Sequence, residues 1–401
     1  MSDDATARRP RLLVLASTFP ARMGDGVPAF VLDIAREEAR DADVTVLTPR
    51  VPGAPRREVI DGVAVERFAY FPRRFEDLAD GAILDNLKAR RSRWLQVLPL
   101  LVSQVFAVRR VTRSMRPDAI HAHWVIPQGI AARLAAPRIP VLITTHGGDV
   151  YALNNSIAVR LKKAILRRAS RVTTVNAEMA TRLSGWGVEA TRMRVLPMGV
   201  PLDDVLAARA MTSPIPGRIT VVGRLVEKKG FGVLLEALRE LDDQDWTLHI
   251  IGDGPLRADL EARAAGLPVT FLGQRGRDEV LREMGQSEIV VIPSVSAASG
   301  DQEGLPVVLL EAAAMGCAII ASDLPGLNEA LTDQVDGLLV PQGDVGALAG
   351  AIRSLFADEL LRQRLSAAAA VRGASYSTES IGAGYREVVR ATLAETAAPA
   401  S

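Results

Sequence analysis

The chain has 401 residues, 48% of them hydrophobic, which is enough for roughly two to three domains and for two sizeable cores. Its single cysteine, Cys317, excludes an internal disulfide and is compatible with a reducing cytoplasm. The formal net charge is only +1, and no nucleic acid partner is expected. The charge is unevenly distributed, however, because residues 1–210 carry a net charge of +11 and the remaining residues carry −10. A basic half of this kind fits an anionic acceptor or an anionic membrane surface.

The N-terminal residues 2–11 are charged and lead directly into the first apolar segment. Because no cleavable apolar region precedes that segment, no signal peptide is expected. The sequence therefore predicts a cytoplasmic protein, with peripheral attachment to the inner face of the plasma membrane as an option that the basic half leaves open.

Apolar segments alternate with amphipathic helical segments along the whole chain, the pattern of α/β domains with parallel sheets. Prolines and a glycine interrupt the pattern at 197–201, after a strand at 193–196. We therefore expect two Rossmann-like domains, 1–198 and 199–375, with a C-terminal amphipathic helix at 376–395 that packs on the first domain. The other strands expected are 11–17, 44–48, 119–122, 141–145, 172–175, 219–222, 247–251, 269–272, 289–293 and 318–322.

The loop after the first strand, residues 18–26, contains Gly24 and Gly26 before a helix that begins near Pro28. Glycine allows a backbone to approach a bound group closely, because it has no Cβ atom. The loop is thus a candidate for contact with a ligand, and an ordinary surface loop is the alternative.

Residues 73–116 combine basic residues with an apolar centre of about fifteen residues, too short to span a bilayer. The segment predicts a pair of helices whose apolar face packs on a core or enters a membrane interface. Its basic residues are Arg73, Arg74, Lys88, Arg90, Arg91, Arg93, Arg109, Arg110, Arg113 and Arg116.

Three histidines, His121, His123 and His146, stand at the ends of expected strands, and Asp149 follows the third. A His-x-His pair with a third histidine is able to ligate zinc, but no Asp or Glu follows at a familiar spacing. We expect structural or supporting roles for His121 and His123, and no metal site.

In the second half, Gly223-Arg224-Leu-Val-Glu-Lys-Lys229-Gly230 lies between a strand and an amphipathic helix. Strand, glycine-bounded basic loop and helix form the usual setting of a phosphate site at the carboxyl edge of a parallel sheet. Arg224 and Lys229 are candidates for binding a diphosphate, and a solvated turn is the alternative.

A tight turn, Gly252-Asp-Gly254-Pro, follows the next strand. A dinucleotide-binding interpretation is weak, since the third glycine is missing and a proline stands where the helix should open.

The segment Glu303-Gly304-Leu305-Pro-Val-Val-Leu-Leu-Glu311 holds two carboxylates eight residues apart. Proline is favoured in a first helical turn, so a helix beginning near Pro306 would carry Glu311 in its second turn. Backbone N–H groups at such a helix start attract anions. An anion site flanked by two carboxylates that bind hydroxyls suits a nucleotide-sugar, and two solvated glutamates at a loop–helix junction are the alternative.

This acidic segment resembles the Glu-x7-Glu signature of the retaining family-4 glycosyltransferases, which have the GT-B fold. The basic loop, the Gly-Asp-Gly-Pro turn, His-Ala-His-Trp and Thr-His-Gly-Gly-Asp are similar to elements of the members that build bacterial exopolysaccharide, colanic acid and teichuronic acid-type polymers. The resemblance covers nearly the whole chain. It implies two Rossmann-like domains that face a cleft, with the C-terminal helix crossing back to the first.

The resemblance also implies roles for individual residues. Glu303 would bind donor-sugar hydroxyls and Glu311 the ribose. The proline at 306 departs from the glycine of many members, so the amides of Gly304 and Leu305 would have to donate to phosphate. By the same resemblance, Arg224 and Lys229 would bind the diphosphate, and His146 would lie against the donor sugar. The glycines expected to contact the donor are Gly24, Gly26, Gly252 and Gly254. His123 and Asp149 would contact the acceptor or support the residues that do.

The function implied is transfer of a sugar from a nucleoside diphosphate sugar to a glycan, lipid-linked or small-molecule acceptor hydroxyl, with retention of configuration. The nucleotide-sugar is a co-substrate and no cofactor is expected. Each Asp-x-Asp pair precedes a strand rather than following one, and basic side chains supply positive charge, so we expect no metal. A nucleotide-sugar epimerase of the same fold and a non-catalytic assembly scaffold are the alternative functions.

Overall fold

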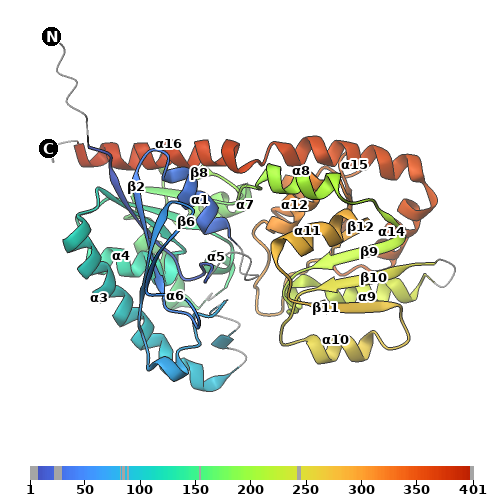
Figure 1. Cartoon of the computed structure of the whole chain (residues 1–401), viewed down its shortest axis with the longest axis horizontal. Helices are drawn as coiled ribbons and strands as arrows, with labels where there is room; N and C mark the ends of the chain where they lie inside the picture. The colour runs from blue at the N-terminus through green and yellow to red at the C-terminus, as the bar shows by residue number, and fades with distance from the viewer. Residues whose placement is uncertain are drawn as a thin grey trace, which may run out of the picture.

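The computed structural model describes residues 8–21, 29–81, 83, 86–87, 90–152, 155–241 and 245–397. Two α/β domains lie side by side along the long axis of the molecule, and helix α16 (Thr378–Ala397) runs over the first of them (Figure 1). The fold class expected from the sequence is confirmed.

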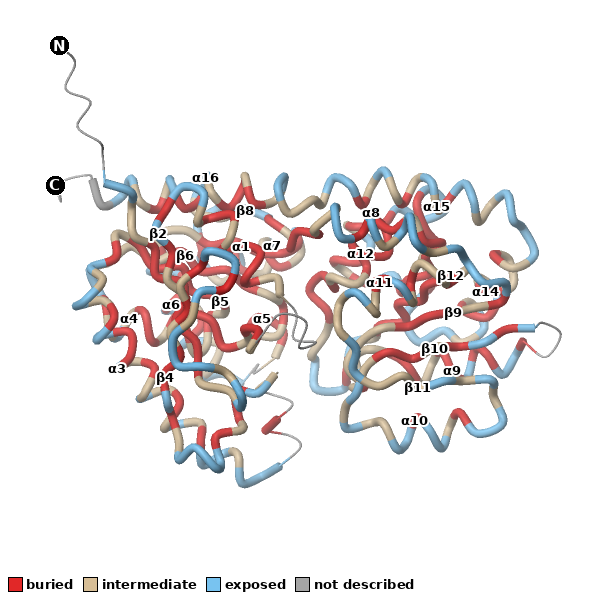
Figure 2. The backbone as a smooth tube through the Cα atoms, in the orientation of Figure 1, coloured by how far each residue is buried: buried red, intermediate tan, exposed pale blue. Residues whose placement is uncertain are grey.

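The first domain is built on an eight-stranded sheet with the order β3-β4-β2-β1-β5-β6-β7-β8, parallel except for the β3–β4 pair. Figure 2 shows its strands buried between covering helices. Its elements are β1 (Arg11–Leu15), α1 (Phe30–Glu38), β2 (Asp43–Pro49), β3 (Arg57–Ile60), β4 (Val63–Phe68), η1 (Arg73–Phe75), η2 (Arg91–Gln96), α3 (Val97–Met115), β5 (Ala119–His123), η3 (Val125–Gly129), α4 (Ile130–Ala135), β6 (Val141–Thr145), α5 (Gly148–Tyr151), α6 (Ser156–Leu166), β7 (Arg171–Thr174), α7 (Ala177–Gly185), η4 (Ala190–Arg192) and β8 (Met193–Val195).

The second domain has a six-stranded parallel sheet with the order β11-β10-β9-β12-β13-β14. Its elements are α8 (Leu202–Ala210), β9 (Ile215–Val222), η5 (Glu227–Lys229), α9 (Phe231–Arg239), β10 (Thr247–Ile251), α10 (Arg257–Arg263), β11 (Val269–Gly273), α11 (Arg277–Gly285), β12 (Ser287–Ile292), α12 (Val307–Met315), β13 (Ala318–Asp323), α13 (Leu327–Ala330), β14 (Leu338–Pro341), α14 (Val345–Ala357) and α15 (Glu359–Ala374).

All the expected strands are present, but three further ones were not expected: β3, β4 and β14. β3 and β4 form an antiparallel hairpin at the sheet edge. Its turn is Asp61-Gly62, both with positive φ (47° and 82°), which is a common two-residue hairpin connection. The hairpin turn could therefore have been predicted from the Asp61-Gly62 pair in the sequence.

The chain crosses between the domains twice, and the two crossings pair with each other. The amide of Val200 donates to the Tyr376 carbonyl at 2.8 Å, and the amide of Thr378 donates to the Val200 carbonyl at 2.9 Å. Beyond the second crossing, α16 buries Tyr385, Val388 and Val389 in the core of the first domain. The expected return of the C-terminal helix is thereby confirmed, and both crossings are held at one place.

Candidate active site

The acidic segment begins in the loop between β12 and α12, at the carboxyl end of the second sheet, and continues into α12. Glu303 is buried, and its carboxylate lies 3.3 Å from the Lys229 ammonium and 3.7 Å from that of Lys228. Burial alone would raise the pKa of Glu303, but the two ammonium groups outweigh it and lower that pKa. Among the described residues, no group donates a hydrogen bond to its buried Oε1. The Lys228 ammonium lies 3.7 Å from this oxygen, beyond hydrogen-bonding distance, so a ligand hydroxyl could still donate a hydrogen bond to it.

Lys229 closes the short helix η5, and Gly230 follows with φ +66°. A Cβ atom on Gly230 would lie 1.7 Å from the Pro293 carbonyl oxygen, at the end of β12. Only glycine allows this close approach, which brings the basic loop against the acidic one. Lys228 is held differently, with its ammonium 3.3 Å from the Asp301 carboxylate.

Arg224 is half-buried in the turn directly after β9, within the same basic loop. The Gly-Asp-Gly turn packs on this loop: a Cβ atom on Gly252 would lie 1.9 Å from the Gly223 carbonyl oxygen, and one on Gly254 would lie 2.6 Å from the Leu225 carbonyl oxygen. Close packing of two loops at one sheet edge therefore requires both glycines, and donor contact by them stays a prediction.

Glu311 lies within α12 and is buried against a partner that the sequence did not suggest. The Arg277 guanidinium is 2.9 Å from the Glu311 carboxylate and 4.0 Å from that of Asp33, which belongs to α1 of the first domain. Burial raises the pKa of Glu311, with Arg277 opposing the change and Asp33 adding to it. Arg277 directly follows the loop after β11, so its position at the carboxyl edge of the sheet could have identified it.

The first domain contributes a histidine-lined surface. His146 follows β6 and is half-buried; its Nε2 lies 3.0 Å from Nδ1 of the buried His123. Burial and the neighbouring His121 lower the pKa of His146 to about 3. Burial, His121 and His146 together lower the pKa of His123 well below its usual range. Both rings are therefore neutral at physiological pH.

Asp149 holds the loop that carries His146. Its two carboxylate oxygens accept hydrogen bonds from the amides of His146 and Val125, each at 3.0 Å. Burial raises the pKa of Asp149, and these two amide bonds oppose the rise. The carboxylate thus fixes the ends of two neighbouring strands, β5 and β6. The His121 ring shares hydrogen bonds with Thr144 of the neighbouring strand β6 and with Glu38 of helix α1, each at 2.6 Å.

The loops of the two domains meet directly. Gly147 has φ +106°, and a Cβ atom there would lie 3.0 Å from the Gly304 amide nitrogen. The Asn176 side chain donates to the Gly304 carbonyl at 2.6 Å. The Glu329 carboxylate of the second domain accepts from the Ala177 and Glu178 amides at the start of α7, at 2.7 and 3.2 Å. The structure therefore brings the His146 loop and the Glu303 loop together.

The remaining predicted site residues have fewer contacts that connect them to the candidate site. Leu305 is buried in a core that includes Leu309 and Val175, so its side chain packs and only its amide remains a candidate donor. Gly24 and Gly26 lie outside the described residues. Within the described ranges, no group of three His, Cys, Asp or Glu side chains is arranged to hold a metal ion.

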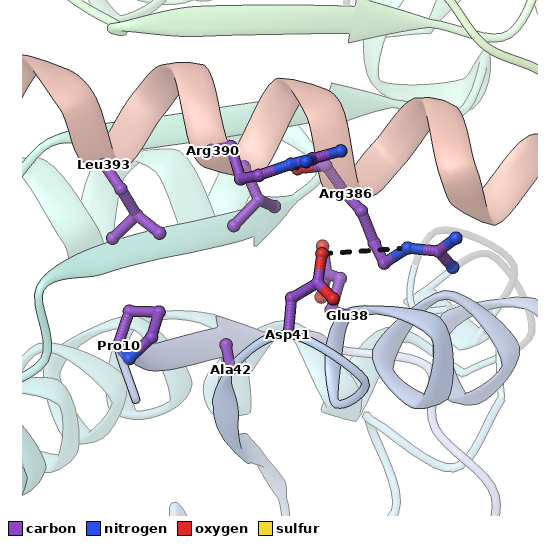
Figure 3. Close-up of a pocket in the computed structure, with 8 residues that line it drawn as sticks. Pro10, Glu38, Asp41, Ala42, Arg386, Arg390 and Leu393 are labelled. Carbon is purple, nitrogen blue, oxygen red and sulfur yellow. Dashed lines mark hydrogen bonds and ion pairs between the residues drawn. The ribbon is translucent and has the colours of Figure 1, made fainter. Parts of the chain in front are cut away.

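A pocket of about 390 Å³ lies elsewhere, between α16 and the turn after α1 (Figure 3). Pro10 and Ala42, which line it, precede β1 and β2, so it stands at the amino ends of the strands. Arg386 and Asp41 face each other across it at 3.8 Å. The candidate site is at the opposite, carboxyl edge of the sheet.

Comparison with known proteins agrees with this arrangement. A family model described as "Glycosyl transferase 4-like domain" matches residues 25–199, and one described as "Glycosyl transferases group 1" matches residues 216–358. An amylovoran biosynthesis glycosyltransferase from Erwinia amylovora is 36% identical over 43% of this chain and 44% of that protein. A Bacillus subtilis protein, whose name assigns it to teichuronic acid biosynthesis as a glycosyltransferase, is 29% identical over 85% of this chain and 88% of its own length.

Solved structures show the same fold at low identity. Sucrose-phosphate synthase from Thermosynechococcus elongatus has a TM-score of 0.78 and 21% identity over 96% of this chain and all of that one (100%). Anabaena HepE in complex with UDP-glucose has a TM-score of 0.70 and 19% identity over 95% of this chain and 99% of that one. The first domain matches a glycosyltransferase 4-like domain and the second a group 1 glycosyltransferase domain, so the two models together identify the chain as a glycosyltransferase with the GT-B fold.

Proposed function

We propose that the protein transfers a sugar, most simply a hexose, from a nucleoside diphosphate sugar to an acceptor hydroxyl, with retention of configuration and without a metal ion. The observation that carries the proposal is the meeting of the Glu303–Lys229 pair with the His146–Gly147 loop. Sugar-binding and phosphate-binding groups would then stand on either side of one bond, the bond between the anomeric carbon and the diphosphate.

A nucleotide-sugar donor is supported by the chemistry of the second domain and by the UDP-glucose bound to the HepE structure. Lys229 and Arg224 would neutralise the diphosphate, and Oε1 of Glu303, which accepts no hydrogen bond from the described residues, would accept one from a sugar hydroxyl. Glu311 would exchange part of its contact with Arg277 for the ribose hydroxyls.

In the reaction proposed, the acceptor oxygen attacks the anomeric carbon from the side on which the diphosphate departs. The bond from carbon to the phosphate oxygen breaks through an oxocarbenium-like state, and the departing phosphate takes the acceptor proton. Because the pKa of His146 is low, this side chain would act as a neutral hydrogen-bonding group rather than as a general acid. Lys229 and Arg224 would stabilise the charge that develops on the leaving group.

The names of the relatives support an acceptor in bacterial polysaccharide biosynthesis. A cytoplasmic location is part of the proposal, since the buried, unpaired Cys317 fits a reducing compartment.

The test is a panel of nucleoside diphosphate sugars, assayed for nucleoside diphosphate release with and without glycan acceptors. We expect release that depends on the acceptor, and a product whose anomeric configuration, read by NMR, equals that of the donor. Free sugar formed equally well without acceptor would indicate the epimerase alternative. Absence of turnover and of nucleotide binding for every donor would indicate a scaffold, and an inverted product would contradict retention.

A further inference from the structure

The outward face of η2 and α3 is apolar, although it faces water. Trp94, Leu95, Leu98, Val102 and Phe106 are 43–73% exposed. From Leu95 onward they recur every three or four residues, so they form one stripe along the helix. Figure 1 shows α3 on the outer side of the first domain, away from the second domain. Contiguous apolar patches on a surface mark sites of interaction.

The opposite face of α3 is anchored in the domain. Leu100, Val108 and Val111 are buried there, in a core shared with strands of the first sheet. The apolar centre was expected to be too short to span a bilayer, but among the described residues the helical segment Arg91–Met115 is long and apolar enough by length and composition alone. Crossing would require these three side chains to leave the core. The structure therefore favours a helix that lies in an interface over one that spans it.

Arginines frame the apolar stripe. Residues 90–116 include seven arginines and no Asp or Glu. Within the described part of the chain, no salt bridge involves Arg91, Arg109 or Arg113. Within α3, helical spacing places Arg109 and Arg113 on the same face as Leu98 and Phe106, at the C-terminal end of the stripe, and Arg91 begins η2 at its other end. Their charge is thus available to an anionic partner.

Helix η1 extends this surface. Phe75 is 52% exposed, and the Arg74 guanidinium lies 4.7 Å from the centre of its ring. The neighbouring Asp77 accepts a hydrogen bond from Gln96 at 2.8 Å and pairs with Arg93 at 2.9 Å, which fixes this segment beside η2. Another aromatic residue with adjacent arginines therefore lies next to the stripe.

We propose that this surface, formed by η1, η2 and α3, docks on an anionic phospholipid bilayer with α3 parallel to the membrane plane. Trp94, Leu98 and Phe106 enter the boundary between headgroups and acyl chains, and Arg109 and Arg113 pair with lipid phosphates. A bilayer is the occupant that matches both features, since it offers a broad apolar layer beneath a plane of negative charge. Docking does not depend on which sugar the site transfers.

Flotation of the full-length protein with vesicles tests the proposal. Vesicles of phosphatidylcholine with phosphatidylglycerol should bind it about tenfold more tightly than phosphatidylcholine alone. Leu98→Ser with Phe106→Ser should weaken binding about tenfold or more, and so should Arg109→Glu with Arg113→Glu. A matched control, Leu360→Ser with Val371→Ser, changes two side chains of α15 that are 79% and 78% exposed and should bind like the wild type.

A second readout keeps the test independent of variant folding. Brominated phosphatidylglycerol in the vesicles should quench a component of the tryptophan emission, and that quenching should disappear in Trp94→Phe. Absence of binding to either vesicle, or equal binding by all variants, would overturn the proposal. So would a concentration-dependent dimer that Leu98→Ser with Phe106→Ser abolishes, because it would identify a second copy of the chain as the occupant.

Discussion

The two faces of the candidate site differ in charge. The second domain contributes ion pairs: Lys229 with Glu303, and Arg277 with Glu311. The first domain contributes His146 and His123, whose low pKa values keep them neutral.

Because of this difference in charge, the two faces have different roles in the proposed reaction. Charge is concentrated where a diphosphate would bind, and the neutral face is held in shape by hydrogen bonds, such as those of Asp149 to backbone amides. Electrostatic stabilisation of a leaving phosphate then comes from one domain, and the positioning of the sugar comes from both.

Removing charge from the second domain should have the largest effect. Lys229→Ala or Arg224→Ala deletes a charge-assisted bond to the departing diphosphate, so kcat should fall by roughly 10²-fold or more. Lys228→Ala is the matched control and should be mild, because its ammonium is held by Asp301 at 3.3 Å. Steady-state release of nucleoside diphosphate measures all three, and a larger loss in Lys228→Ala would reverse the assignment of the two lysines.

Substitution of Glu303 should mainly affect catalysis, and substitution of Glu311 should mainly affect nucleotide binding. Glu303→Ala misplaces the anomeric carbon, so kcat should fall by about tenfold or more, while the free nucleoside diphosphate still binds. Glu311→Ala removes the expected ribose contact and should mainly raise KM. Calorimetric titration of the nucleoside diphosphate into each variant checks the ranking, and tighter binding by Glu311→Ala than by Glu303→Ala would mean that the roles are exchanged.

Because His146 is neutral in the folded protein, the free energy of unfolding should depend on pH. The pKa of His146 falls from its ordinary 6.5 to about 3 on folding, so between these values the unfolded chain binds a proton that the folded chain does not. Stability is therefore lost as the pH falls below about 6.5. His146→Gln should make the melting temperature less sensitive to acid between pH about 7 and about 5. An unchanged slope would show that the folded protein carries this histidine protonated.

The contact between the domains should have the smallest effect. Glu329→Ala removes two hydrogen bonds to the N-terminus of α7, which should cost about 1 kcal/mol of unfolding free energy. Asp259→Ala, in the first turn of α10 within one domain, is the control and should cost less. Thermal unfolding of both variants measures the difference, and equal costs would argue against a stabilising contact between the domains.

Most of the fold could be predicted from the sequence, because long apolar strands and amphipathic helices have strong periodicity. Strands β3 and β14 were missed because they are four-residue strands at sheet edges, where fewer apolar residues are needed. Strand β4 has six residues and lies inside β3, and it was missed because Glu66 and Arg67 interrupt its apolar pattern. The loops that carry Arg224, Lys229, His146 and Glu303 could be located, since each follows a strand or precedes a helix.

What the sequence did not indicate is which side chains pair across distance. The Glu311–Arg277 pair joins α12 to α11, and the Asn176–Gly304 bond joins the two domains. Both arise from tertiary packing: local patterns place Arg277 at the carboxyl edge of the sheet but do not indicate which side chain it meets.

In the proposed reaction, protein side chains rather than a metal ion supply the positive charge for the departing diphosphate. The most direct test is transfer by the purified enzyme with an active nucleotide-sugar, assayed in EDTA after removal of divalent ions. We expect an unchanged rate in the chelator, together with the loss of rate in Lys229→Ala. Complete loss of transfer in EDTA, restored by manganese or magnesium, would contradict it.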